Sequence, residues 1–116
     1  MMTIERIAYA ALYADPLLLR AYAMKFLDEV RDLHRVPRPD NDNPLVMSVA
    51  AGLLELFCQR AGQKPPTWTR AVGPAPKPTF LWRDAKGFTR RLCQEESPEP
   101  LKRRRLYAAP DFLTFA

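Results

Sequence analysis

The chain has little glycine, cysteine and histidine, and each shortage argues against a class of structure or chemistry. Its 116 residues include 4 glycines, so we expect neither tight hairpins nor a glycine-rich phosphate loop. The two cysteines, Cys58 and Cys93, form no Cys-x-x-Cys pair, which argues against a disulfide framework or a zinc site. His34 is the single histidine, and no hydrolase or metalloprotease motif is present. We therefore expect no enzymatic activity, no metal and no cofactor.

The sequence also lacks a long uninterrupted apolar run. The most apolar stretch, residues 43–62, contains Glu55 and Arg60 and is short for a membrane span. Near the N-terminus, Glu5 and Asp15 lie too close together to flank the apolar segment of a secretory signal. We therefore expect a protein of the reducing cytoplasm that does not associate with a membrane.

Acidic residues are scarce in the second half of the chain. Residues 1–63 contain seven Lys or Arg and eight Asp or Glu, a net charge of −1. Residues 64–116 contain eleven Lys or Arg and only five Asp or Glu, a net charge of +6. This asymmetry predicts an acidic partner for the C-terminal half, either a nucleic acid or an acidic protein surface.

Three predicted helices begin with the same signal, a capping residue followed by proline at the first helical position. The pairs are Asp15-Pro16, Asn43-Pro44 and Ser97-Pro98. Ala85, Phe88, Leu92 and Cys93 are expected to point inward from a further helix. Apolar residues at helical spacing place the helices at residues 3–14, 16–35, 43–62, 83–96 and 98–105.

Residues 43–62 predict the helix around which the other elements pack. Asn43 suits its N-cap, and Gly62 suits the left-handed residue after its end. Its polar residues fall within a narrow band of the helix surface: Ser48, Gly52, Glu55 and Gln59. A helix that is apolar on most sides is normally covered by other elements. We therefore predict an all-α fold, a single small helical domain (residues 1–116) around this central apolar helix.

Proline is abundant, with 12 residues in the chain, and five of these fall in residues 64–79. We expect this segment to be an extended, non-helical arm. The aromatic residues Trp68 and Trp82 favour an arm that packs on its own domain and buries the rings. The alternative is a proline-rich ligand, residues 74–78, offered to another protein.

A basic run near the C-terminus is the most distinctive functional feature. It consists of Lys102, Arg103, Arg104 and Arg105. Lys86, Arg90 and Arg91 would widen it into a patch able to contact phosphates. The alternative is a solvated turn at a helix end. We expect that replacing the three consecutive arginines together weakens partner binding without unfolding the domain.

Two stretches of the chain resemble a known type of protein. Residues 53–62 run into Pro65-Pro66-Thr67-Trp68-Thr69, and residues 97–101 are followed by the three arginines and by Asp111-Phe112-Leu113. This pattern resembles a segment of small prokaryotic proteins of unassigned activity, which in some regulators of the antitoxin type follows a helix-turn-helix domain. The resemblance covers residues 45–115. It implies an antitoxin-like or regulatory component whose partner is a protein, such as a toxin. The DNA-binding domain of those regulators is not matched, so operator recognition is not implied.

These observations leave two functional hypotheses. The first is a non-enzymatic protein that binds a protein partner through its basic half and through Trp68 and Trp82. The second is a nucleic-acid-binding accessory protein that uses the same basic patch, with steeply salt-dependent affinity. The sequence leaves homodimer formation open.

Overall fold

The computed structural model describes residues 1–81 and 86–114, and in this part of the chain it is mostly helical. The predicted all-α class is therefore confirmed. The elements in chain order are α1 (Ile4–Tyr13), α2 (Pro16–Glu29), the 3-10 turn η1 (Leu33–Arg35), α3 (Pro44–Ala61), α4 (Trp68–Ala71), β1 (Thr79–Phe80), α5 (Gly87–Glu96), α6 (Glu99–Lys102) and β2 (Leu106–Tyr107).

The helices α1, α2 and α3 begin where their own local sequence indicates. The side chains of Thr3, Asp15 and Asn43 each accept a hydrogen bond from a backbone N–H in the first turn of the helix that follows. Gly62, with φ of 69°, adopts the left-handed conformation that ends α3. The capping residues predicted for α2 and α3 are therefore correct, and Thr3 caps α1 in the same way.

The second helix is shorter than predicted, because the expected range 16–35 ends at Glu29 and only η1 follows. Leu33 is buried, and its backbone N–H donates to Oε1 of Gln63 over 2.8 Å. The Gln63 amide also donates to the carbonyl oxygen of Arg31 over 3.1 Å. A side chain from beyond α3 thus satisfies backbone groups that a continued helix would have paired internally.

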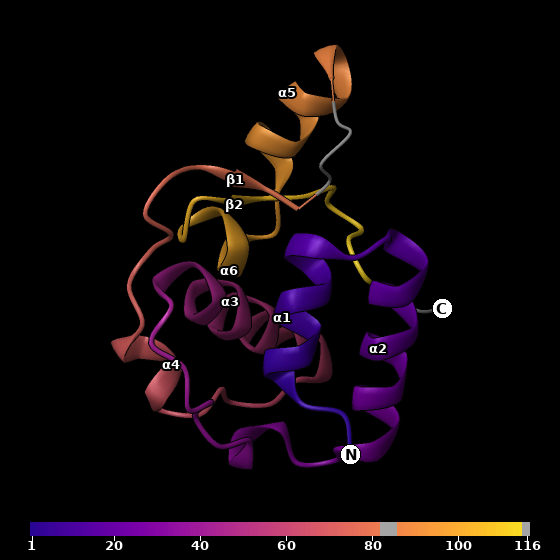
Figure 1. The fold of residues 1–116 in the computed structure, drawn as a ribbon. Helices are drawn as coiled ribbons and strands as arrows, with labels where there is room; N and C mark the ends of the chain where they lie inside the picture. Colours follow the sequence, from indigo (N-terminus) through magenta and orange to yellow (C-terminus); the bar gives the residue numbers. More distant parts are fainter. Residues whose placement is uncertain (82–85, 115–116) are drawn as a thin grey trace.

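The core lies around α3, which contacts α1, η1, α4 and α6 (Figure 1). Every residue of α3 from Val46 to Cys58 is buried. Among the described residues, α3 is the one helix long and apolar enough to cross a membrane, but 72% of it is buried inside the protein. Burial of this extent is that of a core helix in a soluble protein.

The segment 64–81 is not extended throughout, since α4 forms a helical turn within it. That part of the prediction is wrong, because no proline lies between Pro66 and Pro74 to prevent a turn. The Trp68 ring is half-buried, and its Nε1 donates to the carbonyl oxygen of Val36 over 2.8 Å. The expected role of Trp82 lies outside the described residues.

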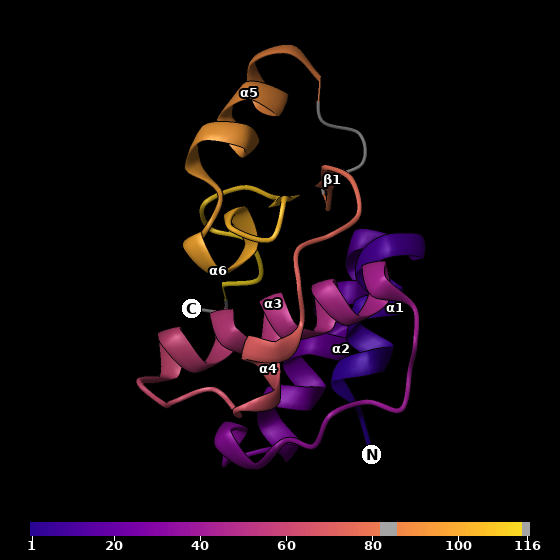
Figure 2. The ribbon, with the colours of Figure 1, turned by 90° about the vertical axis from the view of Figure 1, so that its left-hand side faces the viewer.

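Beyond α4 the chain is extended and rises past α6 to β1 (Figure 2). The two strands pair in parallel, with Thr79 opposite Leu106 and Phe80 opposite Tyr107. The backbone N–H of Ala75 donates to the carbonyl oxygen of Arg104 over 2.9 Å, which continues the pairing toward α4. This segment therefore lies against the last part of the chain.

The fourth predicted helix, residues 83–96, is observed as α5 from Gly87 onward, and its first residues lie outside the described part. The Phe88 side chain is 76% exposed, so the expectation that it points inward is wrong. Cys93, which was also expected to point inward, is the buried residue of α5, and Leu92 is half-buried. The Arg90 guanidinium packs over the Phe80 ring, 4.0 Å from its centre, and this orientation leaves Phe88 facing solvent.

The last predicted helix, residues 98–105, is also shorter, because α6 ends at Lys102. Ser97 does not cap it. The Ser97 hydroxyl is buried and donates to the carbonyl oxygens of Cys93 and Ala108, and it accepts a hydrogen bond from the N–H of Ala108 over 2.9 Å. Ser97 thus joins the end of α5 to the chain beyond β2.

Candidate functional site

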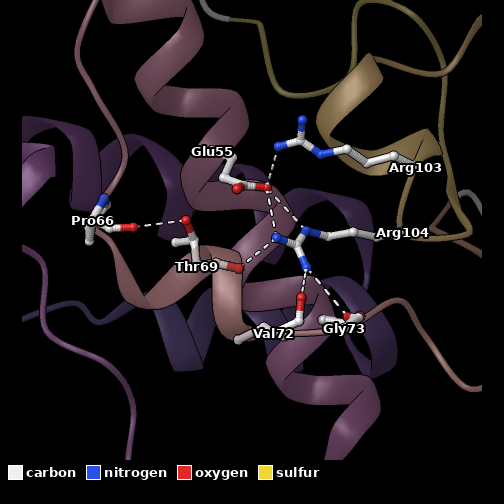
Figure 3. Close-up of polar contacts among 8 residues, drawn as sticks. Glu55, Pro66, Thr69, Val72, Gly73, Arg103 and Arg104 are labelled. Carbon is white, nitrogen blue, oxygen red and sulfur yellow. Dashed lines mark hydrogen bonds and ion pairs between the residues drawn. The ribbon is translucent and has the colours of Figure 1, made fainter.

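The basic run does not form one solvent-exposed patch, because Arg104 is buried where α3, α4 and α6 meet (Figure 3). Its Nε donates to Oε1 of Glu55 over 3.1 Å, and its Nη2 donates to the carbonyl oxygen of Thr69 over 2.7 Å. Its Nη1 donates to the carbonyl oxygens of Val72 and Gly73. With these contacts Arg104 cannot reach a phosphate in solvent, so its predicted role as a surface contact is wrong.

The sequence of α3 explains how an arginine reaches this position. Gly52 and Glu55 lie three residues apart and therefore share one face of the helix. A Cβ atom on Gly52 would lie 3.3 Å from Cδ of Arg104 and 3.1 Å from Cδ2 of Leu101. A larger residue here would require these side chains to shift, so glycine suits the close approach of α6 and of the Arg104 stem, and Glu55 pairs with the guanidinium.

Glu55 is the charged residue on which this cluster depends, since it is only 5% exposed. Its Oε1 pairs with Nη2 of Arg103 over 2.8 Å and with Nη2 of Arg104 over 3.0 Å. Burial, and secondarily the charge of Glu55, raises the pKa of Cys58 to about 11, so this thiol stays neutral near pH 7. A buried carboxylate of this kind is costly unless a cation compensates it, and Arg104 supplies that compensation.

The other residues of the basic run face different surroundings. The Arg103 side chain is half-exposed while it pairs with Glu55. Lys102 is exposed, and its Nζ donates to the carbonyl oxygen of Glu95 over 2.9 Å. Arg105 is exposed and adopts a left-handed backbone conformation, with φ of 63°. A run that is continuous in sequence is therefore divided in space.

A second group of basic residues lies on α5, which projects away from the helical body in both views (Figures 1 and 2). Lys86, Arg90 and Arg91 are exposed there, close in sequence to the exposed ring of Phe88. Trp68 lies on α4, at the opposite end of the molecule from α5. The structure therefore does not bring Trp68 together with the basic residues of α5.

Two features of these sites were missed by reasoning from sequence. Phe88 was assigned to the interior, and helical spacing alone could not have shown otherwise. The pairing of Glu55 with Arg104 could have been found, because a single acid within an apolar helix needs a cation when the helix is buried. The arginine run offered that cation.

The described part of the chain contains no group of three or more His, Cys, Asp or Glu side chains placed to hold a metal ion. No family model, curated protein or solved structure matches this chain. The functional argument therefore rests on the arrangement of its own residues.

Proposed function

We propose that this chain is a non-enzymatic binding protein that attaches to an acidic protein partner through α5. The observation that carries the proposal is the exposed ring of Phe88, 76% accessible, on a helix that projects from the body. Lys86, Arg90 and Arg91 are exposed on the same element. A large exposed aromatic side chain flanked by arginines has the composition of an interface hot spot.

The charges of α5 support a role other than stabilising the helix. Lys86 and Arg90 lie near its N-terminus, and Glu95 and Glu96 lie in its last turn. The helix dipole favours the opposite order, by about 0.3–1 kcal/mol for each charge. Local helix stability therefore does not account for this arrangement, whereas attraction of an acidic surface to the basic end of α5 does.

The resemblance of residues 45–115 to a segment of antitoxin-type regulators narrows the proposal. We infer an antitoxin-like or regulatory component of a prokaryotic two-component module, in which the partner is a toxin-like protein. A cytoplasmic location is part of this proposal and agrees with two buried cysteines that form no disulfide. The proline-rich segment 64–79 and the helix α3 around which it packs would provide the rigid support for α5.

The experiment is an affinity capture from native cell extract, with and without nuclease, using the wild-type chain and two variants. Phe88→Ala removes the proposed anchor, and Leu17→Ala is a matched control because Leu17 is 79% exposed on α2. We expect one protein to be captured in both the presence and absence of nuclease. The purified pair should bind about tenfold more weakly with Phe88→Ala, by loss of a hot-spot side chain, and unchanged with Leu17→Ala.

Equal affinity of the wild-type chain and Phe88→Ala would reject α5 as the docking element. Capture that disappears after nuclease treatment would instead favour the second candidate function.

That second candidate is binding of nucleic acid by exposed basic side chains. The observation in its favour is that Lys86, Arg90 and Arg91 lie close together at the start of α5. Duplex binding would then weaken steeply with salt, and a variant that replaces Lys86, Arg90 and Arg91 with Gln would lose it. A gel-shift assay at low salt that finds no binding to any duplex would reject this function.

A further inference from the structure

Three arginines line one hollow on the surface beside α4. The hollow has a volume of about 440 Å³, and its walls are formed by Glu55, Pro65, Arg70, Arg103 and Arg104. Arg70 is exposed, and no hydrogen bond or ion pair joins its guanidinium to a residue in the described ranges 1–81 and 86–114. Arg103 is half-exposed and uses Nη2 for Glu55. These two side chains therefore offer N–H donors to the hollow.

Arg104 connects the backbone segments that carry these two arginines. Arg103 is its neighbour in the chain, and Arg70 follows Thr69, whose carbonyl oxygen accepts a hydrogen bond from Arg104 Nη2. The Thr69 hydroxyl donates to the carbonyl oxygen of Pro66 over 2.9 Å and so holds the start of α4. One buried guanidinium thus joins the two backbone segments that carry the exposed arginines.

The charges at the hollow indicate what it would bind. Three guanidinium groups and the one carboxylate of Glu55, which pairs with both Arg103 and Arg104, leave the hollow with two net positive charges. A phosphate monoester carries a charge of about −1.5 to −2 at neutral pH and has three acceptor oxygens, enough for two separate guanidinium groups. A single carboxylate carries one negative charge, and would leave one of the two positive charges uncompensated.

We propose that this hollow is a binding site for a phosphate monoester, held between Arg70 and Arg103. The group can belong to a small phosphorylated compound or to a phosphorylated peptide, since the chemistry recognised is the same. This proposal does not depend on the function assigned to α5, because the hollow lies beside α4 and its ligand binds the purified chain without a protein partner.

The test is a calorimetric titration of inorganic phosphate into the purified chain at low salt and neutral pH. We expect one site, and about tenfold or greater weakening in each of the variants Arg70→Gln and Arg103→Gln, through loss of charge-assisted hydrogen bonds. Arg6→Gln is the matched control, because it removes an exposed arginine from α1, which does not line the hollow, and should leave the affinity unchanged. Acetate should bind at least about tenfold more weakly than phosphate.

Further titrations with O-phosphoserine and with a short phosphoserine peptide identify the source of the group. Tighter binding of the peptide than of free O-phosphoserine assigns the site to a phosphorylated protein, and equal binding assigns it to a small compound; both support the proposal. The proposal is overturned if phosphate does not bind, if acetate binds equally, or if Arg6→Gln weakens binding as much as Arg70→Gln. A circular dichroism spectrum of each variant establishes that it is folded.

Discussion

The two halves of this molecule are held together by different means. In residues 1–63 each α-helix begins or ends at a residue that bonds to its own first or last turn, as Asn43 and Gly62 do for α3. In residues 64–114 none of the described helices has a side-chain cap, and contacts distant in sequence define the structure. Arg104 reaches carbonyl oxygens more than thirty residues earlier, and β2 pairs with β1. The first half is therefore encoded locally, whereas the second depends on where partners lie in space.

The largest expected effect comes from removing the buried ion pair between Arg104 and Glu55, one of the contacts that join the two halves. Arg104→Met would leave Glu55 buried with only the half-exposed Arg103 to compensate its charge, and three carbonyl oxygens would lose a donor. Removal of one partner of a buried ion pair costs about 3–5 kcal/mol of unfolding free energy. Urea denaturation followed by circular dichroism measures this loss.

The neighbouring residue provides the control for that experiment. Arg105→Met removes an exposed arginine of the same run and should change the unfolding free energy by less than about 0.5 kcal/mol. Combining Arg104→Met with Glu55→Met should recover part of the loss, because no uncompensated buried charge remains. If Arg104→Met and Arg105→Met were equally stable, the two halves would not depend on this contact.

The difference between local caps and contacts distant in sequence also explains how much of the fold could be predicted from sequence. The capping residues Thr3, Asp15 and Asn43 act on the turn that follows them, so the starts of the first three helices were predictable. The early end of α2 was not, because it depends on Gln63, which reaches back to Leu33 and Arg31. Contacts across thirty residues leave no periodic signal in the sequence.

The limit of prediction from sequence is clearer at the candidate site. The pattern of charge correctly assigned the basic character to the second half of the chain, but it treated the four residues 102–105 as equivalent. Their differences arise from Gly52 and Glu55, which lie on another helix and select Arg104 as the arginine that becomes buried. Likewise, α5 places Arg90 on the Phe80 ring and buries Cys93 while Phe88 faces solvent, and these contacts with other segments are not visible in helical spacing.

A smaller loss of unfolding free energy is expected from a larger side chain at Gly52, where α3 lies close to the second half of the chain. In Gly52→Val the new side chain would collide with Leu101, Arg104 and Leu106, and the closest atom, Cδ2 of Leu101, lies 3.1 Å from the position that the added Cβ would occupy. Overpacking of this kind costs about 1–3 kcal/mol. Gly73→Val is the control, because a Cβ there meets nothing within 4 Å. Equal unfolding free energies of the two variants would show that the halves can move apart at no cost.

The smallest expected effect tests whether the helices of residues 1–63 depend on their own capping residues. The Asn43 side chain accepts hydrogen bonds from the N–H groups of Leu45 and Val46, over 2.9 and 3.2 Å. Asn43→Ala removes both and should cost about 1 kcal/mol, whereas Asn43→Asp keeps an equivalent acceptor and should cost much less. At the corresponding position of α5, Lys86 makes no side-chain capping bond, so Lys86→Ala should leave the unfolding free energy nearly unchanged. Thermal denaturation of the three variants measures these values. A loss in Lys86→Ala equal to that in Asn43→Ala would mean that α5 also depends on its own first turn, and the distinction between the two halves would then fail.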